Sequence, residues 1–115
     1  MKLVYIAEAH AADVWPINSS RCGGPRNTVL APTTVEERRE VAQRMVAALP
    51  GLREVPLLVD GMDDAFLEAF AAWPIRLYGV HRGQLGAIAQ PSRAMFELAP
   101  LRTWLLEACA AARAG

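Results

Sequence analysis

The chain has 115 residues, about the length of one domain, with a hydrophobic fraction of 53% and a charged fraction of 21%. These fractions predict a folded domain with an apolar core and exclude a disordered chain. Twelve basic and twelve acidic residues give a formal net charge of zero. Binding to nucleic acid or to an anionic membrane surface normally needs a basic excess, so both partners are disfavoured.

The beginning of the chain indicates no targeting segment. No apolar run reaches the ~18 to 20 residues that span a bilayer, and Glu8 and His10 soon follow the first apolar run, unlike in a signal peptide. We therefore expect a cytoplasmic protein that does not contact a membrane. The preference for Arg over Lys and the abundant Ala are typical of a GC-rich bacterial genome.

The first element is a strand. Residues 3–7 are β-branched, aromatic or apolar, which predicts a buried strand that ends at Glu8, Ala9 and His10. In open α/β sheets the C-terminal ends of strands are where binding and catalytic sites form.

Residues 15–32 are rich in Pro, Gly, Ser and Asn, and predict a long loop of the kind that often carries function.

Two helices and a second strand follow. Thr33 and Thr34 each precede a Glu by three residues, a capping-box pattern that predicts a helix ending at Pro50 and Gly51. Residues 55–59 predict a short strand, and Asp63 is expected to cap a short helix that continues to about Ala71.

The C-terminal part predicts a hairpin and a helix. Residues 75–80 and 85–89 read as strands around an Arg82–Gly83 turn, and Pro100 suits the first turn of a final helix. On that helix Cys109 is expected to be a small core residue. The order strand, helix, strand, helix, hairpin, helix predicts an α/β fold with a parallel portion and an antiparallel edge.

Four segments together resemble one family. Residues 5–15, Tyr-Ile-Ala-Glu-Ala-His-Ala-Ala-Asp-Val-Trp, resemble the YIxEAHxxDxW signature of the iodothyronine deiodinases and their bacterial relatives. Residues 55–60 resemble the family's PVVVD strand, residues 72–78 its LPxRLY segment, and residues 33–38 its SLEER helix start. These matches keep the family's order across nearly the whole chain. The resemblance implies a thioredoxin-like α/β fold, with a mixed sheet that ends in a β-hairpin and a helix.

The resemblance also implies oxidoreductase chemistry. Family proteins remove iodine reductively from iodothyronines with a selenocysteine or cysteine nucleophile, so a small-molecule substrate and a thiol reductant are the expected partners, without a further cofactor. Bacterial relatives need not share that substrate, so thiol or selenol redox chemistry is implied more firmly than deiodination itself.

The family nucleophile lies well before the EAH strand, whereas this chain starts at Met1, immediately before that strand. We therefore expect residues 1–115 to form one thioredoxin-like domain without its first βα unit, and to be inactive as given. A homodimer is one way to cover the strand edges that this leaves open.

Glu8 and His10 are the expected catalytic residues, because the family uses this pair in proton supply. Two residues apart on a regular strand, their side chains would point to one face. A carboxylate beside an imidazole favours the protonated ring and fixes its orientation. The pattern alone favours a strand-end Glu and a surface His without a catalytic role, and the resemblance reverses this preference. Tyr5 would point to the opposite face and is expected to be a core residue.

Three further residues are expected to contact substrate: Trp15, Pro74 and Arg76. The implied fold places a cis-proline before the hairpin, beside the active thiol, so we expect the bond preceding Pro74 to be cis. An ordinary proline that ends a helix is the alternative. Arg76 stands where the family has an Arg, and a structural ion pair is as good an explanation as substrate contact.

The two cysteines and the acidic turn carry weaker signals. Cys22 is a candidate redox thiol, since the neighbouring Arg21 would favour its thiolate, but a loop cysteine without function is the simpler interpretation. Cys22 and Cys109 are not expected to form a disulfide in a reducing cytosol. No metal is implied, because turn and capping roles explain the aspartates of residues 60–64.

Two other functions stay open. A non-catalytic thioredoxin-fold module would bind a partner or a small ligand, and a thiol protein would use Cys22. A thiol-reactivity assay separates the second from the rest. The DNA upstream of Met1 separates an enzyme from a module, since a Cys or UGA codon there in the same reading frame would indicate the nucleophile.

Overall fold

The computed structural model describes residues 1–16, 29–90 and 97–115. They form two compact units, Met1–Pro74 and Ile75–Gly115, which are described separately. The α/β character predicted from the sequence is confirmed, but the single mixed sheet is not found. The described strands instead pair as two sheets of two strands each, one in each unit.

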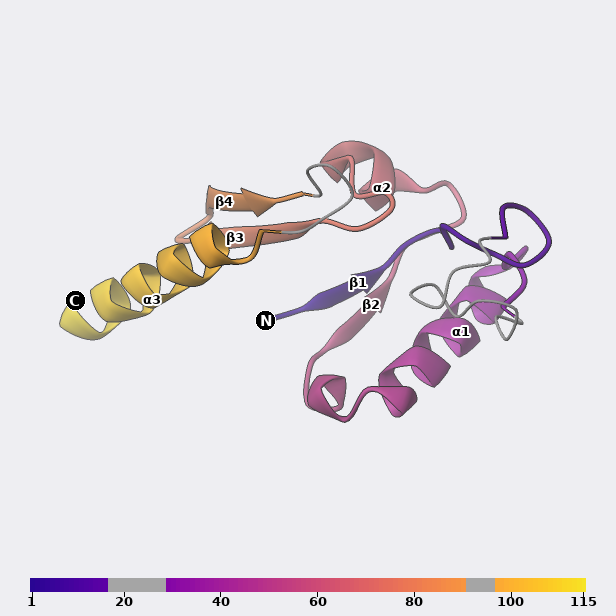
Figure 1. Cartoon of the computed structure of the whole chain (residues 1–115), viewed down its shortest axis with the longest axis horizontal. Helices are drawn as coiled ribbons and strands as arrows, with labels where there is room; N and C mark the ends of the chain where they lie inside the picture. Colours follow the sequence, from indigo (N-terminus) through magenta and orange to yellow (C-terminus); the bar gives the residue numbers. More distant parts are fainter. Residues whose placement is uncertain (17–28, 91–96) are drawn as a thin grey trace. The chain divides into compact units, whose positions relative to one another are not determined.

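The first unit is built on a parallel strand pair. β1 (Leu3–Tyr5) pairs with β2 (Leu57–Val59), with Val4 opposite Leu58. α1 (Val35–Ala48), a 3-10 turn, η3 (Pro50–Leu52), and α2 (Ala65–Phe70) complete the unit. α1 packs against β2 (Figure 1). Its residue Ala42 is completely buried.

The capping box predicted at the start of α1 is present. The hydroxyl of Thr34 accepts a hydrogen bond from the backbone N–H of Glu37 at 3.2 Å. The Glu37 carboxylate in turn accepts from the N–H and the hydroxyl of Thr33, at 2.7 and 2.9 Å. The return bond therefore reaches one residue further back than in the usual box.

A buried arginine fixes α1 to the turn after β2. Arg38 is 3% exposed, donates from Nη1 to the carbonyl oxygens of Asp60 and Gly61, and pairs with Asp64 at 2.9 Å. The buried Asp60 carboxylate accepts from the N–H groups of Phe66 and Leu67 and so caps α2. Asp63, the expected cap, accepts the first helical N–H, that of Ala65, at 3.4 Å. Asp60 takes the next two N–H groups, because the tight turn after β2 brings its carboxylate over the helix start.

The second unit is a hairpin with a helix on it. β3 (Leu77–His81) and β4 (Gln84–Ala89) are antiparallel, joined by the predicted two-residue turn, in which Arg82 and Gly83 both have positive φ. That geometry is the type I′ turn favoured in hairpins. α3 (Ala99–Ala114) packs on the hairpin (Figure 1).

Trp104 is the contact that holds α3 on the hairpin. A Cβ placed on Gly79 would lie 2.3 Å from the Trp104 ring, and one on Gly86 would lie 2.4 Å from its Nε1. Only glycine allows the indole so close to both strands. Trp104 defines the face of α3 that packs on the hairpin, and Cys109 is exposed elsewhere on the helix. The expectation of a core cysteine is therefore wrong.

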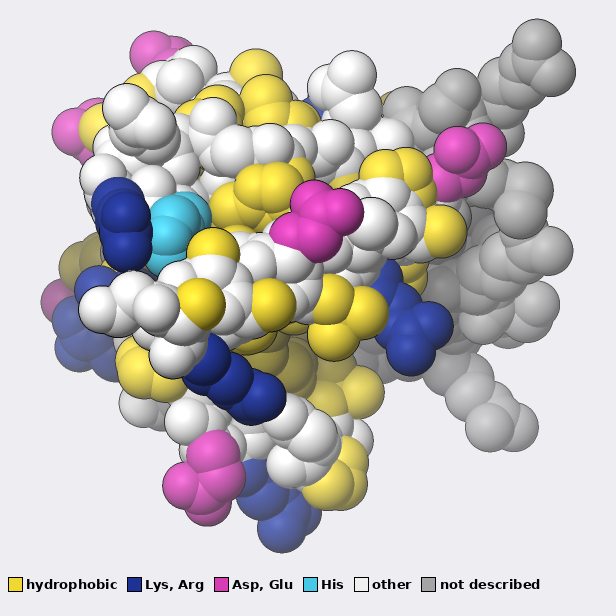
Figure 2. All heavy atoms as spheres, turned by 90° about the vertical axis from the view of Figure 1, so that its left-hand side faces the viewer, with side chains coloured by type: hydrophobic (Ala, Val, Ile, Leu, Met, Phe, Trp, Pro, Cys, Tyr) yellow, Lys and Arg dark blue, Asp and Glu magenta, His cyan; other side chains and the backbone are white. Residues whose placement is uncertain are grey.

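The buried apolar side chains of the described residues are all alanines, residues 11, 42, 72 and 89. Many large apolar side chains are instead exposed, among them Leu77, Val80, Leu85 and Ile88 of the hairpin. Figure 2 shows hydrophobic side chains at the surface among charged ones. The large core that the composition predicted is therefore not found within these residues.

Candidate functional site

Glu8 and His10 lie beyond the first strand rather than on it. β1 ends at Tyr5, whose carbonyl accepts the N–H of Asp60. The partner strand β2 also ends here, and the chain then turns at Gly61. Without a partner strand the backbone does not continue as a strand to Ala7. The argument from strand alternation therefore does not apply to Glu8 and His10: Glu8 contacts Tyr5, and His10 contacts Trp15.

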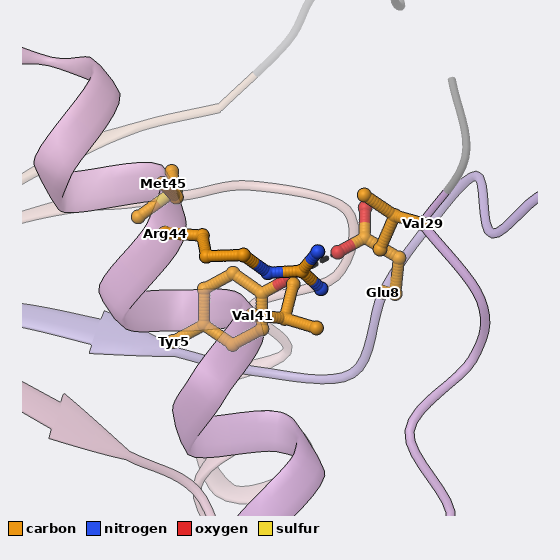
Figure 3. A pocket seen from close by; sticks show the side chains of 6 residues that line it. All are labelled: Tyr5, Glu8, Val29, Val41, Arg44 and Met45. Atoms are coloured by element: carbon orange, nitrogen blue, oxygen red, sulfur yellow. Dashed lines mark hydrogen bonds between the residues drawn. The ribbon is translucent and has the colours of Figure 1, made fainter. Parts of the chain in front are cut away.

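Glu8 is held by Tyr5. The phenol hydroxyl of Tyr5 donates a hydrogen bond to Oε2 of Glu8 (Figure 3). Burial of the phenol, and then this carboxylate, raise the pKa of Tyr5 far above its usual range, against the smaller opposing effects of Arg38 and Arg44. Tyr5 is therefore a neutral hydrogen-bond donor to a candidate catalytic residue, and not the simple core residue expected.

This pair opens onto a pocket of about 360 Å³ on the first unit. Six residues line it: Tyr5, Glu8, Val29, Val41, Arg44 and Met45. Figure 3 shows the guanidinium of Arg44 extending from α1 toward the Glu8 carboxylate. The pocket thus combines a carboxylate, a guanidinium, a phenol and an apolar wall.

His10 belongs to an aromatic cluster. Its ring lies 4.9 Å from that of Trp15, tilted by 56°. Trp15 in turn stacks on Trp73, with ring centroids 5.6 Å apart and planes 15° apart. Trp15 is 52% and Trp73 38% exposed, so large parts of both indoles are free to contact a ligand. Trp73 was not among the residues expected from the sequence to contact substrate, although its place directly before Pro74 was a usable signal.

Local hydrogen bonds hold Trp15 in place. Its N–H and that of Val14 donate to the carbonyl of Ala11, closing a turn that follows His10. The Asp13 carboxylate accepts from the N–H of Ala31 at 2.9 Å. Asp13, an aspartate of the family signature, thus connects this turn to the segment before α1.

The other predicted residues are distributed as follows. The Trp73–Pro74 bond is cis, which confirms the expectation, and Pro74 directly adjoins the aromatic cluster. Arg76 belongs to the second unit, where it donates to the carbonyl of Ile75 at 2.8 Å and forms no ion pair with a described residue. Cys22 lies outside the described residues.

Within the described part of the chain, no group of three or more His, Cys, Asp or Glu side chains has a metal-binding arrangement. None of the described helices combines the length and the apolar character needed to cross a bilayer.

Comparison with known proteins identifies the family. The sequence profile described as iodothyronine deiodinase matches residues 1–109. The chain belongs to the iodothyronine deiodinase family. Thyroxine 5-deiodinase of Gallus gallus is 32% identical over 103 residues, which cover 90% of this chain and 37% of that protein. The enzymes of Sparus aurata and Ovis aries, also named thyroxine 5-deiodinase, are 32% and 27% identical over 90% of this chain.

The chain spans only about a third of the length of these curated relatives, and no solved structure matches it. Family membership confirms the resemblance carried by the EAH segment and supports a deiodinase-like redox function. The relatives named above are vertebrate proteins, so they give no support to the bacterial origin suggested by the composition.

Proposed function

We propose that this chain supplies the proton-donating and ring-binding part of a thiol- or selenol-dependent reductive dehalogenase with a thioredoxin-like fold. The observation that carries the proposal is the placement of His10 at the edge of a stacked, half-exposed pair of indoles. A flat aromatic substrate can stack on such a surface, since aromatic pairs contribute beyond their buried area. The imidazole then lies beside the ring that must be protonated.

The reaction has a simple balance. A selenolate or thiolate attacks the iodine of an aryl iodide, the carbon–iodine bond breaks, and the aryl carbon takes a proton from His10. One thiol displaces iodide from the resulting selenenyl or sulfenyl iodide, and a second thiol regenerates the nucleophile. The sum is one aryl iodide and two thiols converted to one arene, one disulfide, iodide and a proton.

Glu8 takes part in the same proton supply in this proposal. Its carboxylate is held by the Tyr5 hydroxyl two residues before His10, at the edge of the pocket. A neutral phenol in this position orients the carboxylate without losing its own proton, because the pKa of Tyr5 is raised. Pro74 adjoins the indole surface and contributes to substrate binding, and Arg76 is a further candidate contact.

The nucleophile is the part of this chemistry that the described residues do not supply. Their cysteine, Cys109, is exposed on α3 in the second unit. We propose that a cysteine or selenocysteine outside residues 1–115 takes this role, in keeping with the much greater length of the curated relatives. Cys22 is the second candidate, either as a nucleophile or as a resolving thiol.

Heavy-atom quenching tests the ring-binding surface. Thyroxine, the compound named in the relatives' activity, carries iodine and should quench the fluorescence of Trp15 and Trp73 on binding. A Trp104→Phe protein keeps Trp15 and Trp73 as its tryptophans, so its quenching reports on this surface directly, whereas Trp73→Ala should weaken binding at least tenfold. Thyroxine binding of wild-type affinity by a Trp15→Leu, Trp73→Ala protein contradicts the proposal.

A non-catalytic binding module remains the alternative. It would bind the same iodinated ring without breaking the carbon–iodine bond. The protein as its gene encodes it would then release no iodide from that compound, even in the presence of a thiol. A homodimer also stays a proposal, and sedimentation equilibrium measures it directly.

A further inference from the structure

Two different arrangements hold the stacked indoles of the proposed ring-binding surface. Trp73 directly follows the last turn of α2, where the buried Ala72 donates its N–H to the carbonyl of Leu67 at 3.1 Å. Trp15 belongs to no helix or strand, and 52% of its surface is exposed. A helix therefore fixes the start of the Trp73 side chain, whereas Trp15 depends on the turn that precedes it.

Two hydrogen bonds connect that turn to the segment before α1. The N–H of Ala12 donates to the carbonyl of Val29 at 2.8 Å, and the carboxylate of Asp13 accepts the N–H of Ala31 at 2.9 Å. The first bond joins two backbone groups and needs no particular side chain. The second bond exists only because residue 13 carries an acceptor, two positions before Trp15.

The indole stack is too weak to fix Trp15 by itself. The ring centroids of Trp15 and Trp73 are 5.6 Å apart, and such a contact contributes about as much free energy as ordering the backbone of one residue costs. The ring of His10 adds a second contact at 4.9 Å, tilted by 56°. We therefore expect the stacked position of Trp15 to depend on bonds that order its turn beforehand.

We propose that Asp13 is a positioning residue for the ring-binding surface. By accepting the N–H of Ala31, its carboxylate holds the turn so that the Trp15 indole lies against Trp73 and beside His10. This inference rests on the proposed function, since Asp13 orders the surface and does not itself bind the substrate.

The property that matters is the acceptor oxygen of residue 13 and not its charge. The bond to Ala31 is exposed, so solvent and salt screen the negative charge. An asparagine at position 13 keeps an oxygen that accepts the same N–H, whereas an alanine does not. A residue that acted on His10 or on the substrate through its charge would lose its effect in both variants.

The experiment measures the ring-proton NMR shifts of His10 and Trp73 in the ligand-free protein. Both rings lie beside the Trp15 indole, whose ring current displaces their shifts, and Trp15→Leu removes this displacement. Asp13→Ala should lose most of the displacement that Trp15→Leu removes, and Asp13→Asn should keep most of it. Because the Asp13 bond is exposed, the alanine variant should remain folded.

Two further variants separate positioning from a general loosening of this region. Glu37→Ala removes another carboxylate that accepts a backbone N–H, that of Thr33, and should leave the displacement unchanged. Ala31→Pro removes the N–H that Asp13 accepts, so it should cause the same loss as Asp13→Ala. The two substitutions combined should cause no additional loss, because both remove the same bond.

Thyroxine binding then measures the consequence for the ring-binding surface. Because only molecules with Trp15 in place bind well, Asp13→Ala should weaken binding about tenfold, and Asp13→Asn by less than about twofold. Wild-type affinity in an Asp13→Ala protein that has lost the displacement contradicts the ring-binding proposal alone.

The shifts of the ligand-free protein decide the role of Asp13, whether or not thyroxine binds. Loss in Asp13→Ala with retention in Asp13→Asn and Glu37→Ala supports the inference. It is overturned if folded Asp13→Ala keeps the wild-type shifts, if Asp13→Asn loses as much of the displacement as Asp13→Ala, or if Glu37→Ala does.

Discussion

The hydroxyl of Tyr5 donates a hydrogen bond to the carboxylate of Glu8, across the end of the first strand. This contact joins a residue of β1 to the family's EAH segment, and it keeps the Glu8 carboxylate directed at the pocket beside α1 (Figure 3). Because of this contact, the stability of the fold depends on whether the Tyr5 hydroxyl is protonated.

Titration of Tyr5 provides the first prediction. Because the pKa of Tyr5 is higher in the folded than in the unfolded chain, its contribution to stability is present below pH 10.0 and is lost as the pH rises above it. Up to the pH at which the chain unfolds, Tyr5→Phe should show the same phenolate absorbance at alkaline pH as the wild type. A larger absorbance in the wild type before unfolding would mean that Tyr5 ionises normally.

Arg38 provides a stability prediction. Arg38→Met removes two carbonyl contacts and leaves Asp64 without its buried partner, which should lower the free energy of unfolding by about 3 kcal/mol. Asp64 is 35% exposed, so solvent screening reduces the loss from that pair. Urea denaturation followed by circular dichroism measures it. The exposed Arg39→Met is the control, and an equal loss in both proteins would remove the assigned role.

The cap of α1 provides the next prediction. Thr34→Ala should lower the free energy of unfolding by about 1 kcal/mol, and Thr34→Ser should recover most of this loss, because serine keeps the capping oxygen.

The Thr33 N–H and hydroxyl lower the pKa of Glu37. The stability that Glu37 adds over Glu37→Gln should therefore be present above pH 4.5 and disappear as the pH falls below it. A pH-independent difference would contradict this.

The close packing of Trp104 predicts the effect of a single methyl group. Gly79→Ala should destabilise the second unit by about 1–3 kcal/mol, because the new Cβ would overlap the indole unless α3 moves. Gly51→Ala meets nothing within 4 Å and is the control, expected to change stability by less than about 0.5 kcal/mol. Thermal unfolding compares the two, and a neutral Gly79→Ala would show that α3 is not seated on the hairpin as described.

Features that depend on neighbouring residues could be predicted from the sequence. The box at Thr34 and Glu37 and the turn at Arg82 and Gly83 follow from local patterns, and both are present. The cis bond before Pro74, which is also present, was expected from the fold that the family resemblance implies. The motif that identified the family is likewise a contiguous segment, residues 5–15.

Features that depend on distant partners could not be predicted in this way. The end of β1 is set by the length of β2, so the position of Glu8 relative to Tyr5 does not follow from strand alternation. Asp60 caps α2 only because Arg38 holds the intervening turn. Cys109 is exposed because Trp104 selects which face of α3 meets the hairpin.

The central claim is that His10 supplies the proton in a reductive dehalogenation. Iodide release from thyroxine, measured with a thiol reductant and the protein as its gene encodes it, tests this most directly. The wild type should release iodide, His10→Gln should be slower by at least about 100-fold, and His81→Gln on the hairpin should be unchanged. Iodide release by His10→Gln at the wild-type rate would contradict the account.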